Sequence, residues 1–307
     1  MPQRAAGLDV GTNSFLLLIL ARDEAGRESV LLDRSDITRL GQGVDRARAL
    51  APEAVARALV TLGEYAALCR DHGVQACRAV GTSALRDARD RDAFLAQVRA
   101  RCGFEIEVIS GEREAELTYA AVAHDRADDD RPLLLLDIGG GSTELAVGRA
   151  GRLRSRLSLD IGAVRLLDRA GPLADPPTPD DLARLRAAAA EHLAAWQPLA
   201  GEVVGTGGTI TTLAAVQHGL VAYDAALVES TRFTPAAVDA LVARLAALPL
   251  AQRRVVPGLP PARADVIIPG AILLAAALRA LDQQEIGVSA GGLRFALARA
   301  ALAGLGA

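Results

Sequence analysis

Three glycine-rich turns in the sequence each carry hydroxyl side chains, a combination typical of phosphate-binding loops. They read Gly11-Thr-Asn-Ser14, Gly139-Gly-Gly-Ser-Thr143 and Gly205-Thr-Gly-Gly-Thr209. Small residues let backbone N–H groups approach phosphate oxygens directly, and hydroxyl groups add further donors. One such turn alone is more often a simple tight β-turn, because glycine adopts positive φ angles easily. Three in one chain favour a phosphate site.

An aspartate stands two residues before each of the first two turns. Asp9 precedes Gly11, and Asp137 precedes Gly139. Carboxylates beside a phosphate site normally hold Mg²⁺, directly or through water, because a bare carboxylate would repel the anion. Hard oxygen ligands and a phosphate substrate also favour Mg²⁺ over softer metals. The two aspartates therefore predict Mg²⁺ as the cofactor.

The segments around these aspartates repeat one pattern. Asp9, Gly11 and Ser14 align with Asp137, Gly139 and Ser142 at an offset of 128 residues, which is far too long for a solenoid repeat and indicates a duplicated domain core. Each copy reads as a buried strand, a glycine-rich turn and a second strand. Turns at Gly26 and Gly151 then lead into third strands, predicted at 29–34 and 152–159.

The rest of the chain alternates between helix and strand patterns, so the predicted class is α/β. The polar run 125–132 is taken as the domain boundary, giving domain I as 1–125 and domain II as 126–307. A C-terminal helix at about 293–307 could pack back on domain I. Helices are predicted at 52–73, 90–101, 112–123, 179–196, from the third turn to 218, at 235–248 and at 270–281, and strands at 76–80, 105–109 and 286–288.

Composition excludes several classes of protein. With 51% hydrophobic and 23% charged residues over 307 positions, the chain should form packed globular domains. All 34 basic residues are arginine, so mechanisms that need a lysine are excluded. A net charge of −3 argues against a nucleic-acid polymer as partner.

Cysteine and hydropathy patterns predict a cytoplasmic protein with no membrane segment. Cys69, Cys77 and Cys102 have no metal-binding spacing and are expected to be reduced thiols. The apolar run 266–278 is shorter than the roughly 20 residues that a membrane span needs.

The three turns resemble the nucleotide-binding loops of the actin/Hsp70/sugar-kinase superfamily. Four further segments narrow the resemblance to the exopolyphosphatase / guanosine pentaphosphate phosphohydrolase (Ppx/GppA) family, in its short two-domain form. The resemblance covers residues 6 to 297 and implies duplicated ribonuclease-H-like (actin-like ATPase) domains with an interdomain cleft. The four segments are Gly81-Thr-Ser-Ala-Leu-Arg86, Ile109-Ser-Gly-Glu-Arg-Glu-Ala115, Leu159-Asp-Ile-Gly-Ala-Val-Arg165 and Arg263-Ala-Asp-Val-Ile-Ile-Pro-Gly270.

The resemblance implies that Glu114 is the catalytic base and that Arg86 contacts the substrate phosphate. A carboxylate near a phosphate can orient and deprotonate water, and the planar fork of arginine pairs with phosphate oxygens. Glu112 and Glu116 are rivals for the role of base, and a solvated acidic helix is the alternative reading of all three glutamates.

The resemblance also assigns the remaining site residues. Asp137 matches the metal-holding aspartate, with Asp9 and Glu144 completing an acidic cluster, although Glu144 could instead be an exposed strand residue. Arg263 could instead form a structural ion pair with Asp265. The expected phosphate-binding residues are Gly11, Asn13, Ser14, Gly139, Gly140, Ser142, Gly207, Gly208 and Thr209, with Arg39 and Arg263 as second-rank candidates.

The function implied is a Mg²⁺-dependent exopolyphosphatase that releases terminal phosphate from inorganic polyphosphate by water attack. The main alternative is a guanosine pentaphosphate (pppGpp) 5′-phosphohydrolase, so the expected partner is polyphosphate or (p)ppGpp. A sugar or acid kinase and a non-catalytic sensor are weaker alternatives, and a homodimer is compatible with the family. One departure is the last motif, Gly292-Leu-Arg294-Phe-Ala, which lacks the acidic residue that the family often has there.

Overall fold

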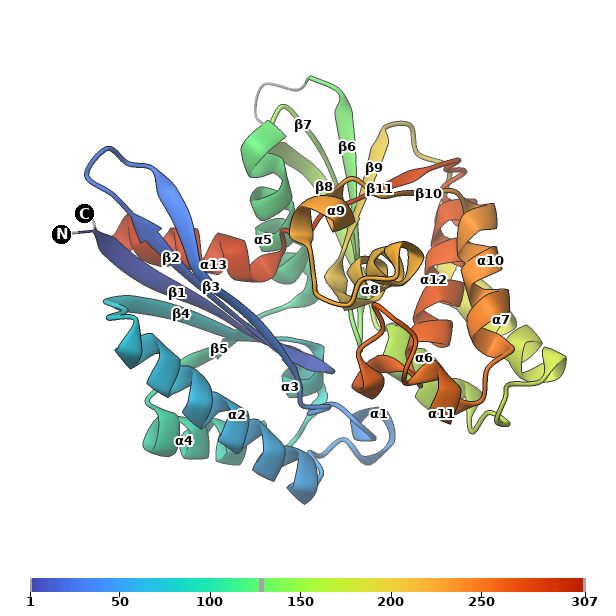
Figure 1. Cartoon of the computed structure of the whole chain (residues 1–307), viewed down its shortest axis with the longest axis horizontal. Helices are drawn as coiled ribbons and strands as arrows, with labels where there is room; N and C mark the ends of the chain where they lie inside the picture. The colour runs from blue at the N-terminus through green and yellow to red at the C-terminus, as the bar shows by residue number, and fades with distance from the viewer. Residues whose placement is uncertain (1, 127–129, 306–307) are drawn as a thin grey trace. The chain divides into compact units, whose positions relative to one another are not determined.

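The computed structural model describes residues 2–126 and 130–305, which form two compact units (Figure 1). Unit 1 combines Met1–Ala121 with Gly291–Ala307, and unit 2 is Val122–Ala290. Part of the expected boundary run, 127–129, lies outside the described residues. In the described part of the chain, no helix is both long and apolar enough to cross a membrane.

Each unit is built on one twisted sheet. Sheet A of unit 1 has the order β3-β2-β1-β4-β5, and sheet B of unit 2 has the order β10-β11-β9-β6-β7-β8. The strands of sheet A are β1 (Gln3–Val10), β2 (Ser14–Arg22), β3 (Glu28–Ile37), β4 (Ala76–Gly81) and β5 (Ile106–Val108). Those of sheet B are β6 (Pro132–Ile138), β7 (Thr143–Arg149), β8 (Arg152–Leu159), β9 (Glu202–Thr206), β10 (Arg232–Phe233) and β11 (Ile286–Val288).

The two sheets share one topology. In each, an antiparallel meander of three strands is followed by two parallel strands, so β1–β5 correspond to β6–β9 and β11. Even the irregularities match, because the register shifts between Ile19 and Leu20 in one copy and between Val147 and Gly148 in the other, again 128 residues apart. The predicted α/β class and ribonuclease-H-like duplication are confirmed.

Helices cover the sheets and connect the strands. Those whose first residue lies in unit 1 are α1 (Val44–Ala47), α2 (Pro52–Asp71), α3 (Ser83–Asp87), α4 (Arg91–Cys102), α5 (Gly111–Ala123) and α13 (Leu293–Gly304). Unit 2 holds α6 (Ala163–Ala170), α7 (Pro179–Leu193), α8 (Gly207–His218), α9 (Ala225–Glu229), α10 (Pro235–Ala246), α11 (Leu250–Arg253) and α12 (Ile267–Ala280), with 3₁₀ turns at His124–Arg126 and Pro261–Arg263.

The alternation of side chains along β1 and β2 gives sheet A two apolar faces. Leu8, Leu17 and Ile19 belong to one cluster with residues of α2 and α4. On the other face, Ala5 and Leu18 pack with residues of α13. The C-terminal helix is therefore part of unit 1.

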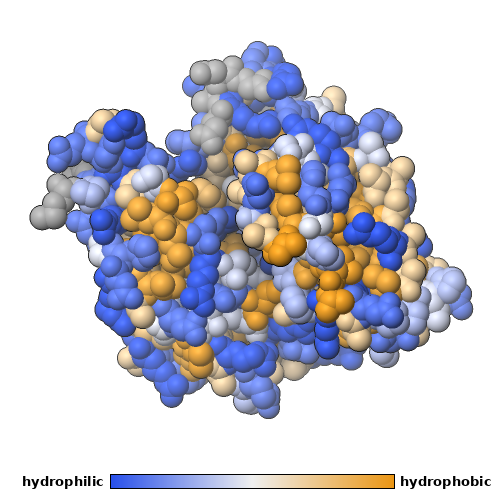
Figure 2. Space-filling model, in the orientation of Figure 1, coloured by the Kyte–Doolittle hydropathy of each residue, from blue (hydrophilic) through white to orange (hydrophobic). Residues whose placement is uncertain are grey.

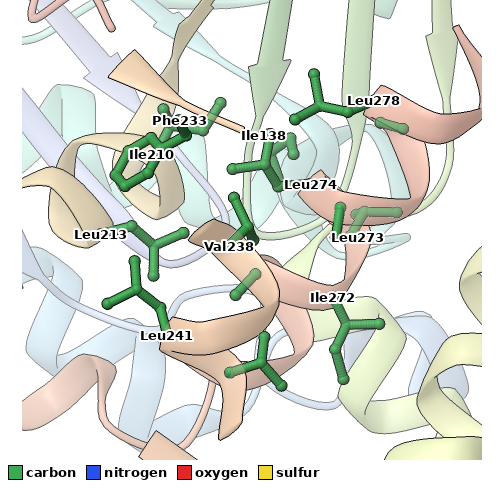
Figure 3. Packing of buried hydrophobic residues seen from close by; sticks show 14 of the residues in the cluster. Ile138, Ile210, Leu213, Phe233, Val238, Leu241, Ile272, Leu273, Leu274 and Leu278 are labelled. Atoms are coloured by element: carbon green, nitrogen blue, oxygen red, sulfur yellow. The ribbon is translucent and has the colours of Figure 1, made fainter. Parts of the chain in front are cut away.

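Unit 2 has its own core, in which α10 and α12 pack beside sheet B (Figure 3). Ile138 from β6 belongs to the same hydrophobic cluster as Leu274 from α12 and Ile210 from α8. On the face that Figure 2 shows, both units carry apolar patches among hydrophilic side chains.

Several element boundaries differ from those predicted. The third phosphate turn is shorter than expected, since α8 already begins at Gly207. Helix α12 begins at Ile267 rather than Gly270, and Pro269 is tolerated because N–H groups in the first helical turn need no intrahelical acceptor. The short helices α1, α3, α6, α9 and α11 were not predicted, because four to eight residues are too few to establish a helical period.

Helix α13 approaches β1 so closely that only glycine fits at position 7. A Cβ atom there would lie 2.1 Å from the carbonyl oxygen of Arg294 and 2.6 Å from the backbone nitrogen of Ala298. We expect Gly7→Ala to lower the free energy of unfolding by about 2–4 kcal/mol, because backbone atoms cannot move aside as a flexible side chain can. Gly63→Ala is the matched control in α2, where a new methyl group meets nothing within 4 Å. It should raise the free energy of unfolding by roughly 0.5–1 kcal/mol. Urea denaturation of both variants checks this, and equal stability of the two would contradict it.

Candidate phosphate-binding and catalytic site

The predicted site residues gather at the carboxyl ends of the parallel strands in each sheet. In sheet A, Val10 pairs with Gly81 and Gly81 with Val108, so the segments that follow β1, β4 and β5 leave the same edge. In sheet B, Asp137 pairs with Thr206, and Gly205 pairs with Val288. This edge is where open α/β sheets bind ligands.

The first turn of unit 1 is closed by backbone hydrogen bonds. Gly11 N–H donates to the Ser14 carbonyl at 3.1 Å, and Arg39 N–H donates to the Asn13 carbonyl at 2.9 Å. Arg39 has a φ of 54°, a conformation that non-glycine residues rarely adopt. The Asn13 side-chain oxygen is buried and has no hydrogen-bond partner in the described part of the chain, so it can accept from a bound group. Asp9 lies at the end of β1, opposite Leu16.

The second turn, in unit 2, has the same central hydrogen bond. Gly139 N–H donates to the Ser142 carbonyl at 3.0 Å. The segment after β8 packs directly on this turn, since a Cβ atom at Gly162 would lie 2.6 Å from the Gly140 carbonyl. Backbone N–H groups at the start of α6 donate to the Gly139 and Gly140 carbonyls at 3.0 and 2.8 Å. The turn is thus fixed before any ligand binds.

Arg165 in α6 contacts this turn, and the sequence did not predict that contact. Its side chain is buried, and its Nε donates to the Gly141 carbonyl at 2.8 Å. A strongly basic residue in a segment of otherwise small and apolar residues was the available signal. Its contact makes it a positioning residue for the glycine turn.

The third glycine-rich segment forms the N-terminus of α8. The first backbone N–H groups of a helix have no intrahelical acceptor and can bind a phosphate. Gly207 has a φ of 89°, and a Cβ atom there would lie 2.3 Å from Asp137 Oδ1. A Cβ atom at Gly208 would lie only 1.8 Å from an Arg263 guanidinium nitrogen. Glycine at these two positions therefore lets a carboxylate and a guanidinium approach the same helix end, where Thr209 is buried.

Arg263 remains a cation in this position. Burial lowers the pKa of its guanidinium to about 10, and nearby Tyr223 opposes that shift. A group with this pKa stays protonated at neutral pH. It therefore offers positive charge beside the α8 N-terminus.

Asp137 and Glu144 lie directly opposite each other on β6 and β7. Glu144 is 1% exposed, which excludes the exposed-strand reading, and it accepts a hydrogen bond from Ser158 Oγ at 2.8 Å. Among the residues that the structure describes, no three Asp, Glu, His or Cys side chains converge as a metal site. Two carboxylates nevertheless suit Mg²⁺, which proteins usually hold through one or two carboxylates, waters and substrate phosphates.

Glu114 and Arg86 form an ion pair in unit 1. Helix α3 begins after β4 and carries Arg86, whereas α5 begins after β5 and carries Glu114 in its first turn. Arg86 Nη1 lies 2.7 Å from Glu114 Oε2 and also donates to the Ile109 carbonyl at 3.1 Å. The side chains are 20% and 12% exposed. Burial raises the pKa of the Glu114 carboxyl, and the Arg86 charge and hydrogen bond oppose that shift.

The rival glutamates have different surroundings. Glu112 is exposed, and Glu116 is paired with Arg113 at 3.0 Å on the outer part of the helix. Of these three glutamates, only Glu114 is both largely buried and paired with Arg86, the arginine that is predicted to contact the substrate phosphate. The predicted residues of the site thus lie at strand ends, in turns or in short helical segments near the carboxyl edge of their own sheet.

Comparison with known proteins settles the family. A model of the Ppx/GppA phosphatase family matches residues 19–298. The chain belongs to this family. Exopolyphosphatase 2 of Mycobacterium tuberculosis is 37% identical over 297 residues, which cover 92% of both chains. A guanosine-5′-triphosphate,3′-diphosphate pyrophosphatase of Vibrio atlanticus is 36% identical over 168 residues, 55% of this chain and 33% of that protein.

Solved structures of the Ppx/GppA family have the same fold. The crystal structure of the Aquifex aeolicus member is 30% identical, with a TM-score of 0.80 over 99% of this chain and 98% of that one. The predicted membership of the family and the predicted enzyme class are confirmed.

The contact between Gly208 and Arg263 can be tested by substitution. In Gly208→Ala the new methyl group displaces the guanidinium, whose flexible end can move, so the free energy of unfolding should change little. We expect the affinity for orthophosphate, measured by calorimetry, to fall about tenfold, as it should in Arg263→Gln. If the two residues act as one unit, the double variant will lose no more than either single variant. Additive losses would contradict the contact.

Proposed function

We propose that this protein is a Mg²⁺-dependent exopolyphosphatase that releases orthophosphate from the end of inorganic polyphosphate. The observation that carries the proposal is the largely buried Glu114 carboxylate at 2.7 Å from Arg86, in a chain whose glycine-rich α8 N-terminus offers backbone donors for phosphate. The name and 92% coverage of the mycobacterial relative support this substrate.

The turns and arginines bind the terminal phosphate. Backbone N–H groups at Gly140 and the start of α8 supply donors to its oxygens, and Asn13, Ser14, Ser142 and Thr209 add hydroxyl and amide groups. Gly11 and Gly139 shape their turns, because their N–H groups donate to the Ser14 and Ser142 carbonyls. Arg263 contributes fixed positive charge, and Arg39 adds a second-rank contact. Phosphoryl transfer needs this kind of positioning and charge stabilisation more than covalent chemistry.

Asp137, Glu144 and Asp9 are the residues that would hold Mg²⁺. When bound, this ion neutralises charge on the phosphate oxygens and orients them. The Ser158 hydrogen bond fixes the Glu144 carboxylate in one orientation. Gly207 leaves room for the Asp137 carboxylate beside the helix N-terminus.

Glu114 acts as the base. Its carboxylate accepts a proton from a water molecule, the water oxygen bonds to the terminal phosphorus, and the bridging P–O bond breaks. The electron pair of that bond stays on the shortened polyphosphate, so the products are orthophosphate and a chain one unit shorter. Arg86 orients the carboxylate and offsets the charge that develops on the phosphate.

A pppGpp 5′-phosphohydrolase is the second candidate. The partial match to the Vibrio protein favours it, and the chemistry is the same with a different leaving group. Side-by-side measurement of Mg²⁺-dependent phosphate release from short polyphosphate, long polyphosphate, pppGpp and ATP distinguishes the candidates. Release from pppGpp alone would overturn the polyphosphate assignment.

Substitution of Glu114 tests the base. Glu114→Gln keeps the shape and can still bond to Arg86, but it cannot accept the proton from water. We expect kcat to fall about 10²–10⁴-fold with little change in melting temperature. Glu116→Gln on the same helix is the control and should keep normal turnover. Near-normal turnover of Glu114→Gln would remove this residue from the role.

The pH dependence of the reaction tests the pairing with Arg86. Because the base must be ionised, activity falls as pH drops through the pKa of Glu114. Arg86 lowers that pKa against the effect of burial, so Arg86→Gln should move the acidic limb of the kcat profile to higher pH as well as lowering kcat. Arg113→Gln, which breaks only the pair with Glu116, should leave the limb in place. If the acidic limb of the kcat profile does not move in Arg86→Gln, a group other than Glu114 is responsible for that limb.

A further inference from the structure

Strand β8, the outer strand of sheet B, carries three exposed arginines. Residues 145–159 contain Arg149, Arg152, Arg154 and Arg156 and no Asp or Glu. Arg149 is neutralised by Asp130, whose Oδ2 lies 2.6 Å from its Nη2. The other three are exposed, and none has an ion-pair partner in the described part of the chain. A local charge of +3 therefore stands on a chain whose net charge is −3.

The arginines of β8 begin next to residues of the proposed site. Ser158 of β8 pairs with Glu144 of β7 and donates a hydrogen bond to it. Arg156 pairs with Ala146 and so lies on the same face of the sheet as Ser158 and Glu144. Arg154 is the extra residue of the bulge, and Arg152 pairs with Arg149 at the hairpin turn, which places it on the opposite face of the sheet from Arg156. From Ser158 to Arg152 the strand covers roughly 20 Å at about 3.4 Å per residue.

Protection of a sheet edge does not account for these arginines. Charged residues on edge strands do prevent pairing with other chains. The corresponding edge strand of the duplicated unit, β3, achieves this with both signs of charge. Its Glu28, Asp33 and Arg34 are all paired, with Arg299, Arg294 and Asp36 among their partners. Because the mixed and paired charges of β3 already protect its edge, protection alone does not require the uniformly positive arginines of β8, which are unpaired in the described part of the chain.

We infer that β8 is a binding track for the part of a polyphosphate chain beyond its terminal phosphate. This inference rests on the proposed function. Arginine forks pair with phosphate oxygens, and the open side of an edge strand adds backbone N–H donors. A linear polyanion with a charge on every unit is the ligand that matches cations spaced along an open strand edge, where side chains from both faces of the sheet can reach it. The track would make the enzyme prefer long chains over short ones.

The test replaces the three arginines together. In the full-length Arg152→Gln/Arg154→Gln/Arg156→Gln variant, we expect KM and Kd for long-chain polyphosphate to rise about tenfold, because three exposed ion pairs are lost. The salt dependence of binding should weaken as well, since fewer counterions are released. The Kd for orthophosphate, a single unit that cannot extend along the strand, should not change. The triple Arg→Lys variant should keep most of the affinity for long chains.

A matched control removes the same charge elsewhere. Arg101, Arg186 and Arg254 are exposed and have no ion-pair partner among the described residues. If their triple Gln variant weakens long-chain binding as much as the β8 variant, net charge and not the track is responsible. Unchanged long-chain Kd in the β8 variant, or a loss confined to single-stranded RNA, also overturns the inference. Lack of phosphate release from any polyphosphate by the wild type would instead overturn the proposed function, and the Kd comparison would still decide on the track.

Discussion

Two carboxylates at directly opposed strand positions set the constraint on which the site depends. Asp137 and Glu144 face each other across β6 and β7, and like charges in this arrangement are unfavourable. The burial of Glu144 increases the cost, because a charge removed from water needs compensation. The Ser158 hydroxyl supplies part of it through a hydrogen bond. Arg263 brings a further positive charge to the same edge of sheet B, where its guanidinium adjoins Gly208 and the Asp137 carboxylate adjoins Gly207.

The corresponding positions of the two sheets differ in the number of carboxylates that they carry. Position 16 corresponds to position 144, and the residue there is leucine, so sheet A has one carboxylate, Asp9, where sheet B has two. Both turns keep the same hydrogen bond between glycine N–H and serine carbonyl, and both are covered by the segment after the third strand. Unit 1 has instead acquired the pair of Arg86 and Glu114 at its edge. The two copies thus share the hydrogen bonds of their turns and differ in the charged side chains that they carry at the same edge.

Most of this frame could be predicted from the sequence, because it depends on local patterns. Glycine-rich turns and buried strands can be recognised in short segments, and the repeat at an offset of 128 residues is found by comparing two such segments. The contact of Arg86 with Glu114 could not be predicted from spacing, since it joins segments 28 residues apart whose meeting depends on the parallel register of β1, β4 and β5. Arg165 was missed for a similar reason, because its partner is a backbone carbonyl 24 residues away.

The surroundings of Glu114 determine what it costs to hold an ionised carboxylate at this position. Its pKa is raised by burial, so the folded state binds its proton more tightly than the unfolded state does. Between the ordinary pKa of a glutamate and the raised one, stability therefore falls as pH rises, and the ionised carboxylate opposes folding. Arg86 reduces this cost by favouring the ionised form, and its second hydrogen bond, to Ile109, ties it to the end of β5. The same contact that makes the carboxylate tolerable thus also fixes where it points.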